Sequence, residues 1–256
     1  MGVFLLLKSD GTSLYSTKDL ALAKIKFDKY KIDRSIYVVD IRQSLYLKQL
    51  FKTLELMGFE QAKQCFHLSY GFVTVEGAKM ASRTGEVVSA EKLYKTTKEK
   101  VLQEIEKREI VSSNEKNEIA NKITLAALKF GILKFSPEVN IDFNWQQALQ
   151  FEGDTGPYIQ YAYARIQSIK GKAKDCGLWP VGKGVDFACL DKCEEWELIR
   201  LIFGFIGVVE DALNKHNPAL LATYLLKLAS GFSKFYQKYS VISAETEELR
   251  KARLYL

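Results

Sequence analysis

The feature that most constrains this 256-residue chain is the alternation of strand-like and helix-like segments in its first 75 residues. The run IYVV at 36–39 has the composition of a buried parallel strand, the apolar run VFLLL at 3–7 predicts another buried strand, and residues 67–75 predict a further strand. Between them, one helix is predicted from about Lys18 to Phe27 and a second one ending at Met57. This order predicts part of an α/β sheet.

The pattern changes after Glu91. The segment from Lys92 to Arg108 is dense in Lys and Glu and predicts a solvated helix. From Asn117 onward almost everything is helix-compatible, and residues 220–239 carry an apolar stripe with basic residues between. We therefore expect a boundary near residue 112, with an α/β part at 1–111 and an all-α bundle at 112–256.

Composition narrows the class of protein. The chain is 47% hydrophobic and 27% charged, which is ordinary for a globular protein, and its net charge of +6 suits a polyanionic partner without proving one. Its four cysteines form no CxxC pair, which favours reduced thiols in a cytosolic protein over zinc ligands or disulfides. The apolar run at 3–7 is far shorter than the roughly 20 residues that a membrane span needs. We expect no metal site and no membrane anchor.

Three polar side chains near predicted helix starts form a first candidate site. Tyr15, Asp19 and Gln43 follow predicted strands, at the sheet edge where α/β proteins bind ligands. A carboxylate with a phenol and an amide could hold a guanidinium group, which pairs bidentately with carboxylates. The alternative is helix capping, because Ser16 with Asp19, and Asp40 with Gln43, both have capping-box spacing.

A basic loop, GAKMASRTGE at 77–86, forms a second candidate site. Lys79 and Arg83 could hold phosphate oxygens, and Ser82 adds a hydroxyl, as in loops that close on charge developing during phosphate chemistry. The alternative is a solvated hairpin tip.

The third candidate is the segment FEGDTGPYIQYAYARIQSI at 151–169, where Thr155 or Gly156 is expected to cap a helix. One apolar face of this helix is predicted to comprise Ile159, Ala162, Tyr163, Ile166 and Ile169. Tyr161 and Arg165 lie on a neighbouring face, where aromatic rings beside Arg suit RNA bases and phosphates. Half-buried tyrosines at the edge of the core are an equally good interpretation.

Together these segments resemble class I arginyl-tRNA synthetases. LLLKSDGTSLYSTKDLALA, HLSYGFVTVEGAKMASRTGEVV and NWQQALQFEGDTGPYIQYAYARI are similar to family stretches in the same order. The resemblance implies a partial Rossmann-like nucleotide-binding half-domain with a KMSKS-type loop, followed by an α-helical bundle that binds the tRNA anticodon arm.

The resemblance also implies roles for individual residues. The positions that bind the arginine side chain in the family correspond to Tyr15, Asp19 and Gln43. The loop that stabilises the ATP phosphates during adenylation corresponds to Lys79, Met80, Ser82 and Arg83, of which Lys79, Ser82 and Arg83 would be catalytic. Candidates for tRNA binding are Tyr161 and Arg165.

The chain departs from the family pattern in several places. Ala81 stands where the loop usually has Ser, and Tyr46 stands where a His is frequent. No HIGH-like string occurs, and the only histidines are His67 and His216. The chain also starts on an uncapped apolar run and stops within an amphipathic pattern, so we expect the C-terminal part of a longer enzyme.

We therefore expect a piece of an arginine–tRNA ligase that is inactive alone. The whole enzyme would use ATP, Mg²⁺, L-arginine and tRNA(Arg) in the cytoplasm, without DNA or a membrane, and another part of it would supply the N-terminal half of the catalytic fold. The alternative is a non-catalytic tRNA-binding module derived from the family.

Overall fold

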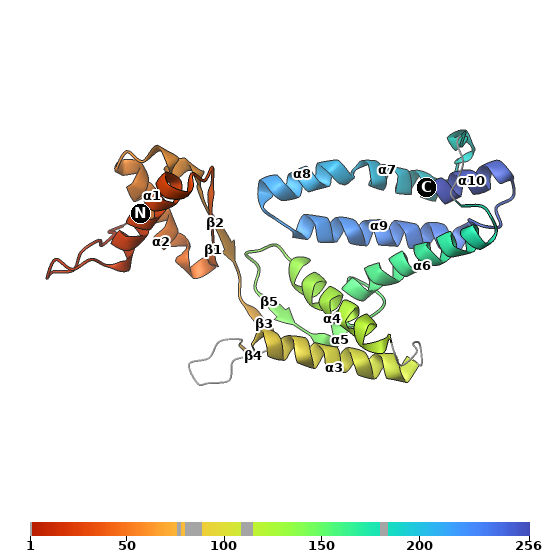
Figure 1. The fold of residues 1–256 in the computed structure, drawn as a ribbon, viewed down its shortest axis with the longest axis horizontal. Coiled ribbons are helices and arrows are strands. Elements are labelled where there is room, and N and C mark those ends of the chain that lie inside the picture. Colours follow the sequence, from red (N-terminus) through yellow and green to blue (C-terminus); the bar gives the residue numbers. More distant parts are fainter. Residues whose placement is uncertain (1, 76–77, 80–88, 109–114, 180–183) are drawn as a thin grey trace. The chain divides into compact units, whose positions relative to one another are not determined.

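The computed structural model describes residues 2–75, 78–79, 89–108, 115–179 and 184–256, which form two compact units (Figure 1). The first unit comprises 1–72 with 137–140, and the second comprises 73–136 with 141–256. The boundary expected near residue 112 falls outside the described residues, and the division into 1–111 and 112–256 stays a prediction.

The first unit contains a parallel strand pair with helices, as the alternating pattern predicted. Its elements are α1 (Tyr15–Tyr30), β1 (Ser35–Asp40), η1 (Ile41–Gln43), α2 (Ser44–Leu56), η2 (Glu60–Gln64) and β2 (Cys65–Tyr70). β1 pairs with β2 in parallel register from Ser35 opposite Cys65 to Asp40 opposite Tyr70. Leu47, Leu50 and Leu54 recur at helical spacing on α2, and all three are buried in the core of this unit.

The strand expected at 3–7 is wrong. This segment is extended, but among the described residues its ladder pairing is limited to an isolated antiparallel bridge from Leu7 to Ser13. Hydroxyl groups of α1 donate hydrogen bonds to two carbonyls of this segment. Ser16 Oγ donates to Leu5 O at 2.6 Å, and Thr17 Oγ1 donates to Leu6 O. Leu5 O is therefore bonded to a side chain of the helix, and Leu6 O accepts both from Thr17 Oγ1 and from Leu14 N, the latter at 3.0 Å.

The single strand expected at 67–75 is divided. β2 ends at Tyr70, and β3 (Val73–Val75) belongs to a separate sheet. Gly71 lies between them, where its N–H donates to Pro137 O at 2.7 Å and a Cβ would lie 2.4 Å from Val139 O. The close approach of this second chain segment requires a residue without a side chain at the break.

The second unit is mainly helical. Its small sheet has the order β4-β3-β5, with β4 (Ala78–Lys79) antiparallel and β5 (Ile141–Phe143) parallel to β3. Its helical segments are α3 (Ala90–Arg108), α4 (Lys116–Leu133), α5 (Trp145–Ala148), α6 (Gly156–Asp175), η3 (Phe187–Cys189), α7 (Cys193–Phe203), α8 (Phe205–Lys215), α9 (Ala219–Lys238) and α10 (Glu247–Tyr255).

These helices pack as a bundle (Figure 1). α4 packs against α3 and α6, and α9 packs against α6, α7 and α8. The helix predicted as solvated, α3, buries one face through Leu93, Val101 and Ile105, so that prediction was wrong for this face. The chain is thus α/β followed by all-α, as the sequence predicted.

Candidate functional site

The first candidate site lies where α1 meets α2. Tyr15 and Asp19 are one turn apart on α1, and Tyr46 of α2 contacts both of them. Tyr46 Oη donates to Asp19 Oδ2 at 2.5 Å, and the rings of Tyr15 and Tyr46 have centroids 5.0 Å apart. Gln43 lies one helical turn before Tyr46 and is exposed. The structure therefore brings Tyr15 and Asp19 together through Tyr46.

The capping alternative for Asp19 was wrong. Helix α1 begins after Leu14, which makes no side-chain cap, and the hydroxyl of Ser16 is bonded to Leu5 O instead. For the second pair, Asp40 does cap: its carboxylate accepts from Arg42 N at 2.9 Å and starts the short helix η1. Asp19 is thus left with a different partner, the phenol of Tyr46.

Tyr46 is a residue of this site that the sequence analysis noted only as a departure from the family pattern, without giving it a role. Burial raises the pKa of Tyr46, and the hydrogen bond to Asp19 and the negative charge of Asp19 add to that rise. Burial also raises the pKa of Tyr37, to which the charge of Asp19 contributes. Both phenols thus remain protonated at neutral pH, and Tyr46 is a constant hydrogen-bond donor. Its three-residue spacing from Gln43 was the available signal.

The second candidate site lies mostly outside the described residues. Met80, Ser82 and Arg83 are not described, and of Lys79 only the backbone is, as part of β4 opposite Thr74. The phosphate-binding role of this loop stays a prediction. Within the described ranges, no group of three or more His, Cys, Asp or Glu side chains could hold a metal ion.

The third candidate site is built on the start of α6. Thr155 caps this helix by accepting from Tyr158 N at 3.2 Å, and its own hydroxyl donates to Gln150 O at 2.6 Å. Gly156 follows, where a Cβ would lie 2.3 Å from Ala126 O of α4. Of the two caps left open by the sequence, Thr155 is the cap and Gly156 permits the close contact.

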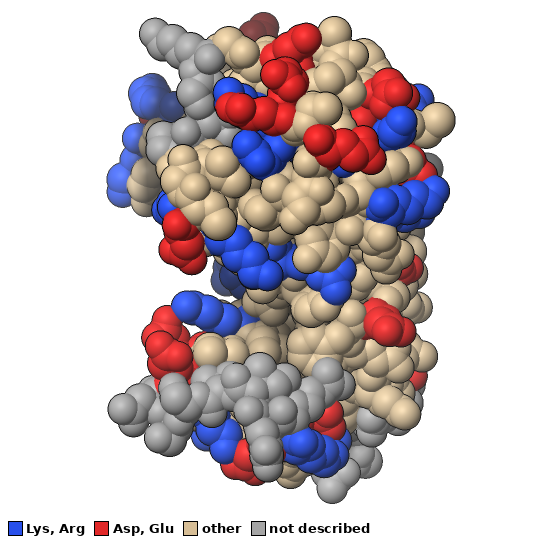
Figure 2. All heavy atoms as spheres, turned by 90° about the vertical axis from the view of Figure 1, so that its right-hand side faces the viewer, with Lys and Arg blue, Asp and Glu red and all other residues tan. Residues whose placement is uncertain are grey.

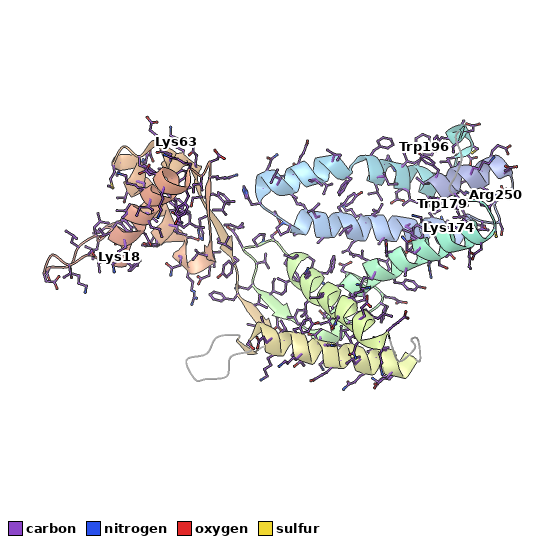
Figure 3. The ribbon with its side chains drawn as sticks, viewed as in Figure 1. Lys18, Lys63, Lys174, Trp179, Trp196 and Arg250 are labelled. Carbon is purple, nitrogen blue, oxygen red and sulfur yellow. The ribbon has the colours of Figure 1, made fainter. Side chains whose placement is uncertain are left out.

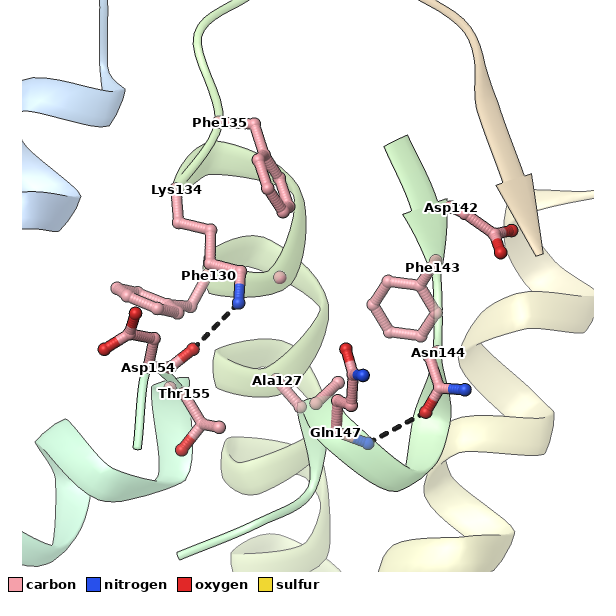
Figure 4. Close-up of a pocket in the computed structure, with 13 residues that line it drawn as sticks. Ala127, Phe130, Lys134, Phe135, Asp142, Phe143, Asn144, Gln147, Asp154 and Thr155 are labelled. Carbon is pink, nitrogen blue, oxygen red and sulfur yellow. Dashed lines mark hydrogen bonds between the residues drawn. The ribbon is translucent and has the colours of Figure 1, made fainter. Parts of the chain in front are cut away.

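A small pocket lies beside this joint (Figure 4). Its volume is about 30 Å³, and its lining includes Phe130 of α4, the C-cap Lys134 of that helix, Phe143 of β5 and Thr155. Lys134 Nζ donates to Asp154 O at 3.0 Å across it. Because ligand pockets typically measure hundreds of cubic ångströms, this pocket is a packing joint that orients α6.

Tyr161 and Arg165 lie together on α6, and α9 adds a second tyrosine. Arg165 Nη2 donates to Tyr161 Oη at 2.5 Å. The Arg165 guanidinium carbon lies 4.6 Å from the Tyr161 ring centroid and 4.9 Å from that of Tyr236. Tyr236 in turn stacks on Phe232, with centroids 5.9 Å apart. The guanidinium is thus held between two exposed tyrosine rings, an arrangement suited to stacking with an RNA base.

Tyr236 was missed because its partners are about 70 residues away in the sequence; only the basic and aromatic pattern of 220–239 pointed to it. The apolar face predicted for α6 was correct only in part. Ala162 is buried, but Tyr163 is 62% exposed and Ile166 is 37% exposed.

Basic side chains extend this surface. The last turns of α6 carry Lys170, Lys172 and Lys174, and Lys170 Nζ lies 4.9 Å from the ring centroid of Trp179. Lys174 and Trp179 are labelled in Figure 3. The face seen in Figure 2 has a band of Lys and Arg side chains across its middle, with Asp and Glu more frequent toward the top. Such a band is suited to a polyanion.

None of the helices in the described part of the chain is long and apolar enough to cross a membrane.

Comparison with known proteins gives two family matches. Residues 1–145 match the model of class I tRNA synthetases (R), catalytic domain, and residues 159–256 match the DALR anticodon binding domain. The arginine–tRNA ligase of Clostridium acetobutylicum is 40% identical over 249 residues, which is 97% of this chain and 43% of that protein. The arginine–tRNA ligase of Bdellovibrio bacteriovorus is 38% identical over 258 residues, covering 100% of this chain and 44% of that protein.

Solved structures with a similar fold are also arginyl-tRNA synthetases. The arginyl-tRNA synthetase of Thermus thermophilus has a TM-score of 0.84 and 30% identity, over 98% of this chain and 47% of that one. The arginyl-tRNA synthetase of Plasmodium falciparum shares the fold, with a TM-score of 0.78 at 23% identity, over 98% of this chain and 42% of that one. The chain thus spans a little over two fifths of the length of the curated relatives it matches.

Proposed function

The chain belongs to the class I arginyl-tRNA synthetases, corresponding to a C-terminal portion of them, and we propose that it supplies the arginine-side-chain site and the anticodon-arm-binding bundle of an arginine–tRNA ligase. The whole enzyme would join arginine to ATP as arginyl-adenylate, with release of pyrophosphate, and then transfer the arginyl group to tRNA(Arg), with release of AMP. This reaction takes place in the cytoplasm.

The observation that carries the proposal is the pairing of Asp19 with Tyr46 beside Tyr15. A part-buried carboxylate beside aromatic rings is suited to a guanidinium group, which is planar, weakly hydrated and able to stack on rings. Tyr15, Asp19 and Gln43 would contact the arginine side chain. The ring of Tyr15 is 64% exposed and thus accessible to a ligand.

The bundle would bind the anticodon arm through Tyr161 and Arg165 of α6, with Tyr236 of α9 as an additional contact. The exposed rings offer stacking surfaces, and the guanidinium and the α6 lysines offer positive charge for the RNA backbone.

ATP would be held by the loop of Lys79, Met80, Ser82 and Arg83, with Lys79, Ser82 and Arg83 stabilising charge on the phosphates. Mg²⁺ would accompany ATP, because it binds chiefly through the phosphates of such substrates. These 256 residues contain no HIGH-like string, so the chain by itself should not catalyse arginine-dependent ATP–pyrophosphate exchange. Exchange by the purified chain would contradict this part of the proposal.

Replacing Asp19 by Asn tests the arginine site in an enzyme that contains this chain. The change removes the charge that pairs with guanidinium, so we expect KM for arginine to rise about ten- to a hundredfold and KM for ATP to change little. Asp28→Asn is the matched control, because Asp28 is an exposed aspartate on the same helix.

Equal effects of Asp19→Asn on the two KM values would argue against an arginine site at Asp19. If the chain binds tRNA but no variant alters arginine use, the non-catalytic tRNA-binding module is the better account.

A further inference from the structure

The Asp19 carboxylate can work as a guanidinium receptor only if its orientation is fixed. The terminal torsion of an aspartate side chain has a broad preference and does not fix the plane of the two oxygens. Bidentate pairing with a guanidinium group requires that plane to match the fork of N–H donors. Something outside Asp19 must therefore set its orientation.

Tyr46 is placed to do this. Its hydroxyl donates to Asp19 Oδ2 at 2.5 Å, in a part-buried position. Its ring is fixed in turn by the rings of Tyr15, at 5.0 Å, and Phe4, at 5.6 Å. The neighbouring residue Leu47 is buried and anchors this turn of α2 in the core.

The hydrogen bond leaves room for a ligand. An ionised carboxylate has about four lone-pair sites, and the phenol uses one of them. Because burial and the charge of Asp19 raise the pKa of Tyr46, the phenol keeps its proton and does not compete as an anion. Asp19 thus retains acceptor sites for two N–H groups while its plane is held.

We infer that Tyr46 is a positioning residue of the arginine site: its hydroxyl holds the Asp19 carboxylate in the orientation that receives a guanidinium group, and this makes the site distinguish arginine from an uncharged analogue of the same shape. The inference rests on the proposed function of that site. Tyr46 acts through Asp19, whereas Tyr15, Asp19 and Gln43 are the proposed contacts.

The test is a pair of binding titrations on the purified 256-residue chain. L-arginine and L-citrulline are titrated separately, since citrulline keeps the shape of arginine but replaces one guanidinium nitrogen by oxygen and carries no charge there. Binding is followed by NMR of ¹³C-labelled tyrosine rings, and thermal unfolding is recorded for each variant. The variants are Tyr46→Phe, which keeps the ring and removes the hydroxyl, and Tyr30→Phe, a matched control at an exposed tyrosine of α1.

We expect Tyr46→Phe to weaken arginine binding about tenfold or more, because a hydrogen bond to a charged group is lost. Citrulline binding should change less than about twofold, so the preference for arginine should fall by the same factor of about ten. Tyr30→Phe should behave like the unmodified chain.

Two results would overturn the inference and leave the proposed function standing. One is an arginine preference in Tyr46→Phe as large as in the unmodified chain. The other is an equal loss of arginine and citrulline binding with a lower unfolding temperature, which would show that the hydroxyl only joins α1 to α2. If the unmodified chain shows no preference for arginine over citrulline, the proposed arginine site fails and the inference fails with it.

Discussion

At the scale of single residues, Glu194 at the start of α7 makes the stability of the fold depend on pH. A hydrogen bond from Lys238 lowers the pKa of Glu194 to about 2 from an ordinary value of 4.5, with further contributions from its own backbone N–H and from the Tyr239 hydroxyl. Tyr239 Oη donates to Glu194 Oε2 at 3.0 Å. These contacts join α7 to the end of α9.

The direction of the pH effect follows from the lowered pKa. The stabilisation by Glu194 is complete above about pH 4.5 and is lost as the pH falls toward 2, because the unfolded state binds the proton first. We expect Glu194→Gln to lower the unfolding temperature near neutral pH, and the difference from the unmodified chain to shrink between pH 4.5 and 2. A calorimetric series in which that difference stays constant with pH would contradict this account; Glu210→Gln, on α8, is the matched control.

Residues of the candidate sites could be selected from the sequence only where they lie close together in one segment of the chain. Tyr15 and Asp19 were selected because they lie close together after a predicted strand, but the helix was predicted only from about Lys18, whereas α1 begins at Tyr15 and puts the two residues one turn apart. Tyr46 and Tyr236 contact their partners from other helices: Tyr46 bonds to Asp19, 27 residues away, and the ring of Tyr236 lies beside the guanidinium of Arg165, 71 residues away. No local pattern specifies such contacts, because they depend on how helices pack.

At the scale of elements, the close contact between α6 and α4 predicts that two glycines of α6 respond in opposite ways to replacement by alanine. At Gly156 a Cβ would lie 2.3 Å from Ala126 O, whereas at Gly171 it would meet nothing within 4 Å. We expect Gly156→Ala to destabilise the chain by about 2 kcal/mol or more, because the backbone of α4 must move. Gly171→Ala should stabilise it by up to about 1 kcal/mol, since Ala is the better helix former.

Urea unfolding of both variants checks this prediction. If the two substitutions have effects of the same sign and size, the close approach of α6 to α4 is not what requires Gly156.

Helices were predicted well where apolar residues recur at helical spacing through a whole segment. α2 and α9 match their patterns because their apolar residues recur at helical spacing. The failures have physical causes outside the segment. Residues 3–7 are all apolar, as in a buried strand, but hydroxyl groups of α1 donate to the carbonyls of Leu5 and Leu6. The segment 67–75 is divided where Gly71 meets residues 137–139.

At the scale of the whole molecule, the two units correspond to two tasks that the proposed function assigns to one chain. The first unit contains the arginine-side-chain residues, and the second contains α6 and α9 with their tyrosines, Arg165 and lysines. The fold class was predictable because the change from alternating strands and helices to continuous helical pattern is visible in the sequence. The division into these two compact units was not predictable from the sequence, because residues 137–140 belong to the first unit although they come from a distant part of the chain.

The central claim is that this chain is a working part of an arginine–tRNA ligase, and anticodon discrimination by its bundle tests it most directly. The measurement is an equilibrium filter-binding titration of the purified chain with tRNA(Arg) and with the same tRNA carrying a substituted anticodon, at one fixed salt concentration. We predict tighter binding of tRNA(Arg) than of the substituted tRNA, and a loss of that preference in Arg165→Ala. Lys172→Ala should weaken the binding of both tRNAs equally and leave the preference unchanged, because a contact to the RNA backbone does not read a base. Equal affinity of the chain for the two tRNAs would contradict the account.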